Sequence, residues 1–462
     1  MCRTLNTTAN ILDEIEQAYK EKTVKSTELY EQSVKTAVAG VHHNGMIANW
    51  PVERGIAPLF MNKGEGSRVW DVDGNEYADY WLGHSALFLG HAYPAVVKAV
   101  QEQAALSAFV GDHTEIQLKL QNKISKMMPC AEMVRFCNSG TEAGLYAVRV
   151  ARGYTKRHKI GKFAGDYHGT FDQLYWYKSA PYDRPMSAGI LEDTRKNTVR
   201  LQYDDIDWLE KAVKKNDLAA IFFTPAAGSE GGALAPNPEF LMALRDIATE
   251  HDILLIADEV VTGFRLARGG GQEYFGVPSD MAMLGKIMGG GIGAVGAVVG
   301  KRDIMEVMNP KVPERATWER VDTKGTFSGN ALVSAAGFAT LDIIDKAEGE
   351  LNRHANRLGD KLREDLSDLF ERRKIKAQAV GSGSLVSVHF TDRPLRYVSD
   401  LLYPGAKETT DRKALYEYSM WLITHGIYTN PRHNFHISTV HTDADIEKFV
   451  RITEEYLKKK GI

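Results

Sequence analysis

The sequence predicts an α/β protein: a three-layer large domain built on a mostly parallel β-sheet, with a smaller α+β domain formed by both chain ends. Apolar runs at residues 219–226 and 253–260 carry no polar alternation, which is typical of strands buried on both faces. A stretch with helical periodicity at 238–252 separates them, and strands joined through a helix pair in parallel. The 462 residues are enough for such a division.

The two chain ends differ from the central part of the chain in their sequence patterns. Residues 11–22 and 26–38 are predicted to form polar helices, and the alternating runs around Asp73-Gly74-Asn75 predict a β-hairpin. Beyond residue 345 we expect a long charged helix, a strand, another helix, a second strand and a closing helix from Asp443. An N-terminal helical arm is predicted at 1–57 and the first part of the small domain at 58–104. The large domain is predicted at 105–345 and the rest of the small domain at 346–462.

The composition of the chain limits which binding partners and which cell compartment are expected. A net charge of -3 disfavours nucleic acid or an anionic membrane as the main partner. The three cysteines, at positions 2, 130 and 137, are odd in number and lack paired spacing, which favours a reducing compartment. No apolar run approaches the roughly 20 residues of a membrane span, and the first residues lack the apolar core of a signal peptide. We expect a cytoplasmic protein.

Two residues at predicted strand ends have side chains suited to catalysis. Lys286 lies in an apolar, glycine-rich run, and burial would favour its neutral, nucleophilic amine. Asp258 ends a buried strand 28 residues earlier, which leaves room for one helical crossover to a neighbouring strand end. A lysine for a Schiff base and an acid beside a pyridine nitrogen are the two groups that pyridoxal phosphate requires.

A phosphate site and an aromatic residue complete the pattern. The predicted strand at 133–137 breaks at Asn138-Ser139-Gly140-Thr141 and a helix begins, so backbone N–H groups and the positive helix end face one spot. Tyr167 follows in "GDYHGTF", where its ring could lie against a planar cofactor.

The motifs "SGTEA", "YHGT", "ADEVVTGFR", "LGKIMGGG" and "GTFSGNAL" resemble, in this order, the class III, fold-type I pyridoxal-phosphate aminotransferases. Within that family the chain is similar to the branch of glutamate-1-semialdehyde aminomutase and the β-amino-acid aminotransferases, from about residue 58 to the C-terminus. The resemblance implies fold type I, pyridoxal 5'-phosphate as cofactor and a homodimer.

The resemblance also implies roles for single residues. Lys286 would form the Schiff base and shuttle a proton, and Asp258 would pair with the ring nitrogen. The remaining cofactor-binding residues would be Ser139, Gly140, Thr141, Tyr167, His168, Val260 and, from the partner subunit, Thr326. Val260 and Tyr167 would cover the two ring faces. The glycines after Lys286 would let the cofactor approach the backbone closely.

The chain departs from the family at two places. Many members carry a glutamate where this sequence has Thr224, so Glu230 is a possible substitute. The aminomutases also carry a glutamate before the C-terminal "HT", whereas this chain reads "NPRHNFHISTVHT". That segment resembles the β-amino-acid aminotransferases, and the resemblance implies that Arg432 binds a substrate carboxylate, a role suited to a guanidinium.

The main functional prediction is an aminotransferase that moves an amino group between an amino acid and a keto acid in a ping-pong reaction. Glutamate-1-semialdehyde 2,1-aminomutase and racemase chemistry stay open as alternatives. A nicotinamide-binding oxidoreductase, suggested by "GIGAVG", is disfavoured because a strand-like run follows it. A zinc site at His433, His436 and His441 is also disfavoured, because residues 433 and 436 point to opposite faces of a strand.

Overall fold

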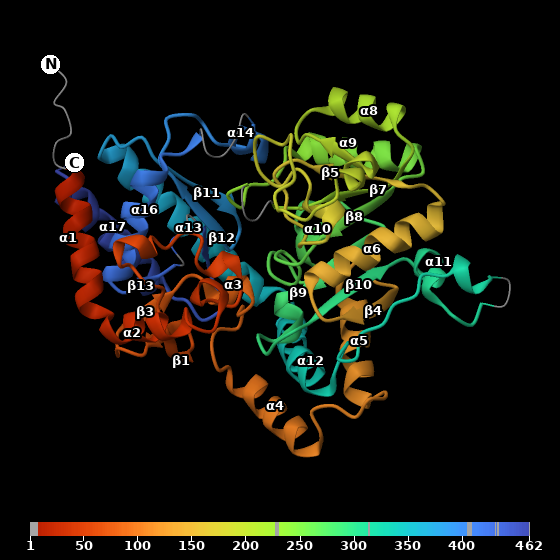
Figure 1. Ribbon diagram of the computed structural model, residues 1–462, viewed down its shortest axis with the longest axis horizontal. Helices are drawn as coiled ribbons and strands as arrows, with labels where there is room; N and C mark the ends of the chain where they lie inside the picture. The colour runs from red at the N-terminus through yellow and green to blue at the C-terminus, as the bar shows by residue number, and fades with distance from the viewer. Residues whose placement is uncertain are drawn as a thin grey trace.

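The computed structural model describes residues 8–226, 231–312, 315–403, 409–429, 431 and 434–461. Figure 1 shows two lobes. The larger one holds the long sheet and its helices, and the smaller one gathers both chain ends, with α1 (Thr8–Lys22) near α17 (Asp443–Lys459). An ion pair of 2.8 Å between Glu14 and Lys459 joins these two terminal helices.

The large lobe is built on a seven-stranded sheet in the order β4-β10-β9-β8-β7-β5-β6. Neighbouring strands are parallel except at β10, which runs antiparallel to both β4 and β9. The mostly parallel sheet expected from the sequence is therefore confirmed. The strands are β4 (Met133–Cys137), β5 (Lys159–Phe163), β6 (Thr198–Leu201), β7 (Leu218–Phe223), β8 (Leu254–Asp258), β9 (Met281–Gly285) and β10 (Gly296–Gly300).

Helices cover both faces of this sheet. Successive strand residues point to opposite faces and therefore pack against different helices. Phe222 and Ile256 pack with residues of α6 (Gly140–Thr155) on one face. Phe223 and Leu255 belong to the core on the other face. The remaining helices of this lobe are α5 (Glu115–Met127), α7 (Asp172–Tyr175), α8 (Ile206–Lys215), α9 (Pro238–Glu250), α10 (Gly270–Phe275), α11 (Arg302–Met305) and α12 (Ala331–Lys346). The result is the three-layer arrangement that the sequence predicts.

The small lobe combines segments from both chain ends. The predicted hairpin forms, and β13 near the C-terminus adds to it in parallel, beside β3. This sheet consists of β1 (Met61–Glu65), β2 (Arg68–Asp71), β3 (Glu76–Asp79) and β13 (Ile427–Tyr428). A second sheet consists of β11 (Gln378–Ser382), β12 (Leu385–His389) and β14 (Asn434–His436). Besides α1 and α17, the small lobe contains the helices α2 (Val24–Ser33), α13 (Glu350–Arg372), α14 (Val398–Leu402) and α16 (Arg412–Thr424).

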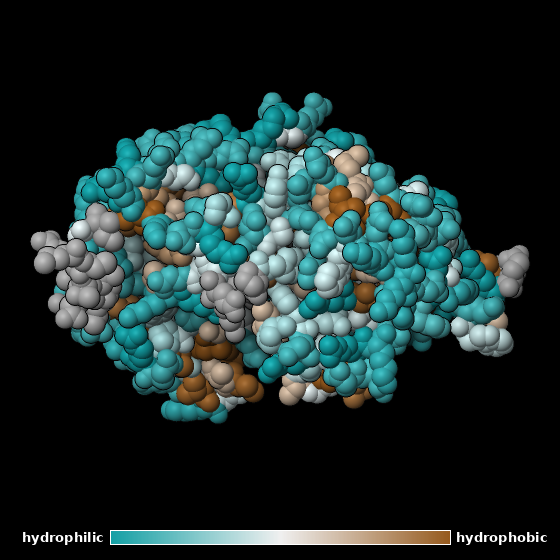
Figure 2. Space-filling model, turned by 90° about the horizontal axis from the view of Figure 1, so that it is seen from above, coloured by the Kyte–Doolittle hydropathy of each residue, from teal (hydrophilic) through white to brown (hydrophobic). Residues whose placement is uncertain are grey.

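Two further helices, α3 (Leu82–Ser85) and α4 (Pro94–Leu106), follow the hairpin. The predicted helix at 26–38 is shorter in the structure, where α2 ends at Ser33. The face seen in Figure 2 is largely hydrophilic, with hydrophobic side chains in small separate patches. Within the described ranges, no helix combines the length and the apolarity needed to cross a bilayer.

Candidate active site

A cavity of about 310 Å³ lies where the two lobes meet. The large lobe contributes strand ends and the start of α6, and the small lobe contributes α3 and β14. Such a position, at the carboxyl ends of parallel strands, is where α/β proteins bind ligands. The walls include Trp81, His84, Ser85, Ser139, Gly140, Thr141, Tyr167, His168, Gly169, Thr224, Asp258, Val260, Val261, Met283, Lys286, Asn434 and His436.

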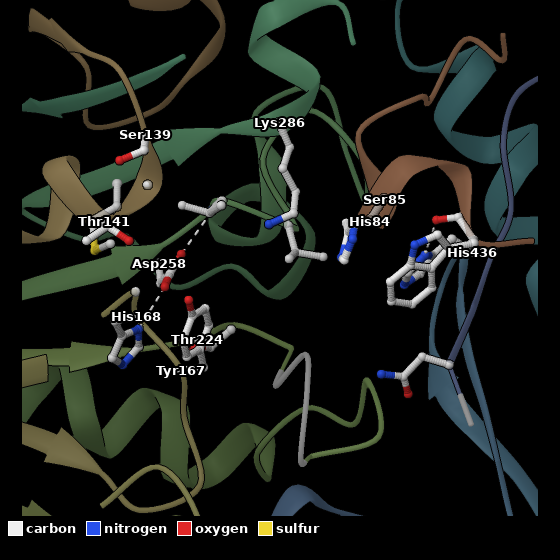
Figure 3. A pocket seen from close by; sticks show the side chains of 17 residues that line it. His84, Ser85, Ser139, Thr141, Tyr167, His168, Thr224, Asp258, Lys286 and His436 are labelled. Carbon is white, nitrogen blue, oxygen red and sulfur yellow. Dashed lines mark hydrogen bonds and ion pairs between the residues drawn. The ribbon is translucent and has the colours of Figure 1, made fainter. Parts of the chain in front are cut away.

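Lys286 lines this cavity from the large lobe. It follows β9 directly and adopts a left-handed φ of +50°, which is uncommon for a non-glycine residue and typical of functional sites. Figure 3 shows its side chain between the group around Asp258 and the group formed by His84, Ser85 and His436. Burial lowers the pKa of Lys286, opposed by the negative charge of Asp258 and reinforced by the positive charge of Arg265.

Asp258 ends β8, the strand next to β9, and is 5% exposed. Its Oδ1 accepts a hydrogen bond of 3.0 Å from the backbone N–H of Val260. Its Oδ2 lies 2.7 Å from Nδ1 of His168, which is 1% exposed. These two contacts fix the orientation of the carboxylate, so that it faces the cavity from a rigid strand end.

The phosphate site predicted at the start of α6 has the expected local geometry. Ser139 is the N-cap, and its Oγ accepts a hydrogen bond of 3.1 Å from the backbone N–H of Glu142. Gly140 and Thr141 form the first turn of a 16-residue helix and line the cavity. The positive end of the helix therefore points into the same space as the amine of Lys286.

These residues fit pyridoxal phosphate. Lys286 makes no hydrogen bond or ion pair with the part of the chain that the structure describes, so its amine is available to an aldehyde. A carboxylate for a ring nitrogen, a helix N-terminus for a phosphate and the aromatic ring of Tyr167 surround the same cavity. The cavity is large enough for a small planar ligand of this kind.

The wall from the small lobe is aromatic and was missed by the sequence analysis. The rings of Trp81 and His84 lie 4.5 Å apart, and the ring of His436 lies 5.7 Å from that of Trp81. Burial and the charge of Arg265 lower the pKa of His436 to about 3, so this imidazole is neutral. Its Nδ1–H donates to the backbone carbonyl of Trp81 at 3.1 Å. The ring of His43 lies 5.3 Å from that of His84, so the loop that carries His43 also reaches this wall.

Some predicted residues lie elsewhere. Thr326 is exposed and does not line the cavity of its own chain. Arg432, Glu230 and His433 fall outside the described residues. In that described part, no cluster of three or more histidine, cysteine or acidic side chains is arranged to hold a metal ion.

The interpretation of the glycines after Lys286 is wrong for Gly290. A Cβ atom on Gly290 would lie 2.6 Å from the backbone oxygen of Ala336 in α12, and its φ is +62°. Gly290 therefore lets the turn after Lys286 pack against α12, and it is not among the residues that line the cavity.

Comparison with known proteins agrees with this geometry. The family model for class III aminotransferases matches residues 50–449. A glutamate-1-semialdehyde 2,1-aminomutase from Methanocaldococcus jannaschii is 40% identical over 441 residues, covering 93% of this chain and 97% of the relative.

Solved structures give the same family. An ω-transaminase from Sphaerobacter thermophilus has a TM-score of 0.86 and 29% identity, covering 96% of this chain and 100% of that protein. A β-phenylalanine aminotransferase from Variovorax paradoxus has a TM-score of 0.85 and 28% identity, covering 98% of both chains. A further transaminase of this fold, 26% identical, holds pyridoxal phosphate. The resemblance seen in the motifs is thus confirmed, and this chain belongs to the class III aminotransferase family of pyridoxal-phosphate-dependent enzymes.

Proposed function

We propose that this protein moves an amino group within one small substrate, as a 2,1-aminomutase of glutamate 1-semialdehyde. The observation that carries the proposal is the likeness to the Methanocaldococcus jannaschii protein of that name, which extends over nearly the whole of both chains. The sequence alone leaves this reaction as an alternative, and the likeness supports it more strongly than transamination between two molecules.

Each residue of the cavity has a proposed role. Lys286 binds the cofactor's aldehyde and then moves a proton to and from the substrate carbons that exchange the amino group. Because burial lowers its pKa, more of its amine is unprotonated than on a surface lysine. Pyridoxal phosphate, when bound, supplies an electron sink for the charge left on carbon. Asp258, oriented by His168, keeps a proton on the ring nitrogen.

The other residues of the cavity bind the cofactor and shield the substrate from water. The start of α6, with Ser139, Gly140 and Thr141, holds the phosphate. Val260 and Tyr167 bound the ring from the large lobe, and Trp81, His84 and His436 enclose the substrate from the small lobe. Enclosure between the lobes excludes water from the proton transfers.

Transamination of an amino acid, including a β-amino acid, is the second candidate. It is favoured by the segment from Asn434 to His441, which has no acidic residue where the resemblance to aminomutases leads us to expect one. Binding of a substrate carboxylate by Arg432 is part of this candidate. The structural likeness to a β-phenylalanine aminotransferase also supports it.

One experiment separates the two candidates. Purified enzyme loaded with pyridoxal phosphate is given glutamate 1-semialdehyde with no amino acceptor. The aminomutase predicts one molecule of the 1-amino-2-keto isomer for each molecule consumed. A parallel panel of α- and β-amino acids, each with a keto acid, tests the second candidate. Turnover only in the panel would reject the aminomutase proposal, and turnover in neither assay would reject both.

Two further properties belong to the proposal. The protein is a homodimer in which Thr326 of one chain reaches the phosphate bound by the other; its exposure and its absence from its own cavity support this. The location is cytoplasmic, which is supported by Cys130 and Cys137, both buried and free.

A further inference from the structure

Two buried carboxylates face the two ring nitrogens of His168. Asp258 Oδ2 lies 2.7 Å from Nδ1, and Asp166 Oδ2 lies 3.7 Å from Nε2. The exposed fractions of His168, Asp166 and Asp258 are 1%, 2% and 5%. The imidazole thus connects the carboxylate at the cavity to a second one that the cavity does not contain.

Asp166 is held firmly in this place. The hydroxyl of Tyr203 donates to its Oδ2 at 2.5 Å and accepts a hydrogen bond of 3.0 Å from the backbone N–H of Thr224. The Nζ of Lys162, fully buried in β5, donates to the backbone oxygen of Asp166 at 2.6 Å. Neither contact is to His168. Burial raises the pKa of Asp166, and His168, Lys162 and hydrogen bonds from Tyr203 and Thr224 oppose this rise.

One atom of each of these two side chains lacks a hydrogen-bond partner. Nε2 of His168 and Oδ1 of Asp166 are buried and make no hydrogen bond with the described residues. A buried polar atom without a partner is costly, and a carboxylate beside a ring nitrogen favours a hydrogen on that nitrogen. Asp258 can only accept from Nδ1 while ionised. A hydrogen on Nδ1 would therefore face Asp258 at 2.7 Å, and a hydrogen on Nε2 would face Asp166 at 3.7 Å.

We propose that Asp166 is a positioning residue that acts through His168: it aligns the imidazole behind Asp258, and so sets how strongly Asp258 holds the ring nitrogen of the cofactor. This inference rests on the proposed function, in which that nitrogen faces Asp258. The sequence motif "YHGT" contains His168 but not Asp166, which precedes it by two residues.

The test compares Asp166→Asn with Tyr203→Phe. The asparagine oxygen can still accept from Tyr203, but its NH₂ would donate to Nε2 and exclude a hydrogen there. Tyr203→Phe removes the hydrogen bond to Asp166 and leaves the charge. The measurements are the dissociation constant of pyridoxal phosphate, the visible absorption band of the loaded protein, and the melting temperature of the protein without cofactor.

We expect Asp166→Asn to weaken cofactor binding roughly tenfold, in line with the loss of supporting partners of ligating histidines, and to shift the absorption band. Tyr203→Phe, which keeps the carboxylate, should lower the melting temperature and change the affinity and the band less than Asp166→Asn does. If both variants alter the melting temperature alone, Asp166 has only a structural role and the inference is wrong. Should Asp166→Asn fail to fold, Asp166→Ser gives the same readouts.

Asp258→Asn separates this inference from the proposed function. If that variant changes the affinity and the band while Asp166→Asn does not, the inference fails and the proposed function stands. If Asp258→Asn changes neither, Asp258 does not face the ring nitrogen, and the proposed function fails with the inference.

Discussion

A Cβ atom on Gly169 would lie 2.5 Å from Oγ1 of Thr141 and 2.7 Å from its Cα. The loop after β5 therefore touches the first turn of α6, and the backbone N–H of Thr170 donates to the same Oγ1 at 3.3 Å. This contact joins the loop that carries Tyr167 and His168 to the helix end proposed for the phosphate. The absence of a side chain at residue 169 is what permits it.

Gly169→Ala should therefore both destabilise the fold and weaken cofactor binding. The Cβ meets backbone as well as side chain, so we expect a loss of about 2–4 kcal/mol in the free energy of unfolding. Gly74→Ala is the matched control, because Gly74 has the same φ of +91° but no atom within 4 Å of a Cβ. Urea unfolding and cofactor titration measure both effects. Equal losses in the two variants would show that φ, and not the contact with Thr141, matters.

Lys286→Ala should abolish amino-group transfer, with a loss on the order of 10³-fold or more, because the variant lacks both the covalent anchor and the group that moves the proton. The fold should persist, since the residue makes no hydrogen bond with the described chain. Lys301→Ala is the control, because Lys301 is half exposed and pairs with Asp280 far from the cavity. After borohydride reduction, mass mapping should place the cofactor on Lys286. A label on another lysine would contradict the assignment.

The elements of the large lobe were well predicted because local signals define them. The strand Met133–Cys137 has the predicted bounds, and Ser139 caps the next helix, since an apolar run followed by a capping residue is a local pattern. Asp258 and Lys286 fall at the ends of adjacent parallel strands joined through α10, as their spacing indicated.

Features that depend on contacts between residues far apart in the sequence were not predicted. The antiparallel direction of β10 follows from its short connection to β9, which lacks a crossover helix. The wall of Trp81, His84 and His436 forms only because β13 and β14 bring the C-terminal segment beside the N-terminal hairpin. His84 also adopts a φ of +59°, which no local pattern announces.

Lys162 should make stability depend on pH. Burial lowers the pKa of this lysine from its ordinary 10.5 to about 7. Between these values the unfolded chain binds a proton that the folded chain does not, so the free energy of unfolding gains up to about 1.4 kcal/mol per pH unit from this group. Below pH 7 the contribution is constant.

Lys162→Met should therefore remove a rise in stability above neutral pH. The difference between wild type and variant in urea unfolding, measured without cofactor at several pH values from 6 to 10, should increase with pH. A difference that stays flat across this window would mean that Lys162 remains charged in the folded protein. Lys159→Met, which affects a partly buried lysine of the same strand bonded to Asn216, is the matched control.

Mixed dimers test whether Thr326 serves the neighbouring chain. Thr326→Ala alone should weaken cofactor binding, because the hydroxyl would be lost from the phosphate. In a dimer of one Lys286→Ala chain and one Thr326→Ala chain, the second chain keeps its own lysine and receives an intact Thr326 from the first. One complete site results, and about half of the wild-type activity per dimer is expected. If Thr326 served its own chain, neither site would be complete and the mixed dimer would be no more active than the Thr326→Ala protein. Differently tagged chains, purified as the mixed species and assayed at saturating and limiting cofactor, distinguish the two arrangements.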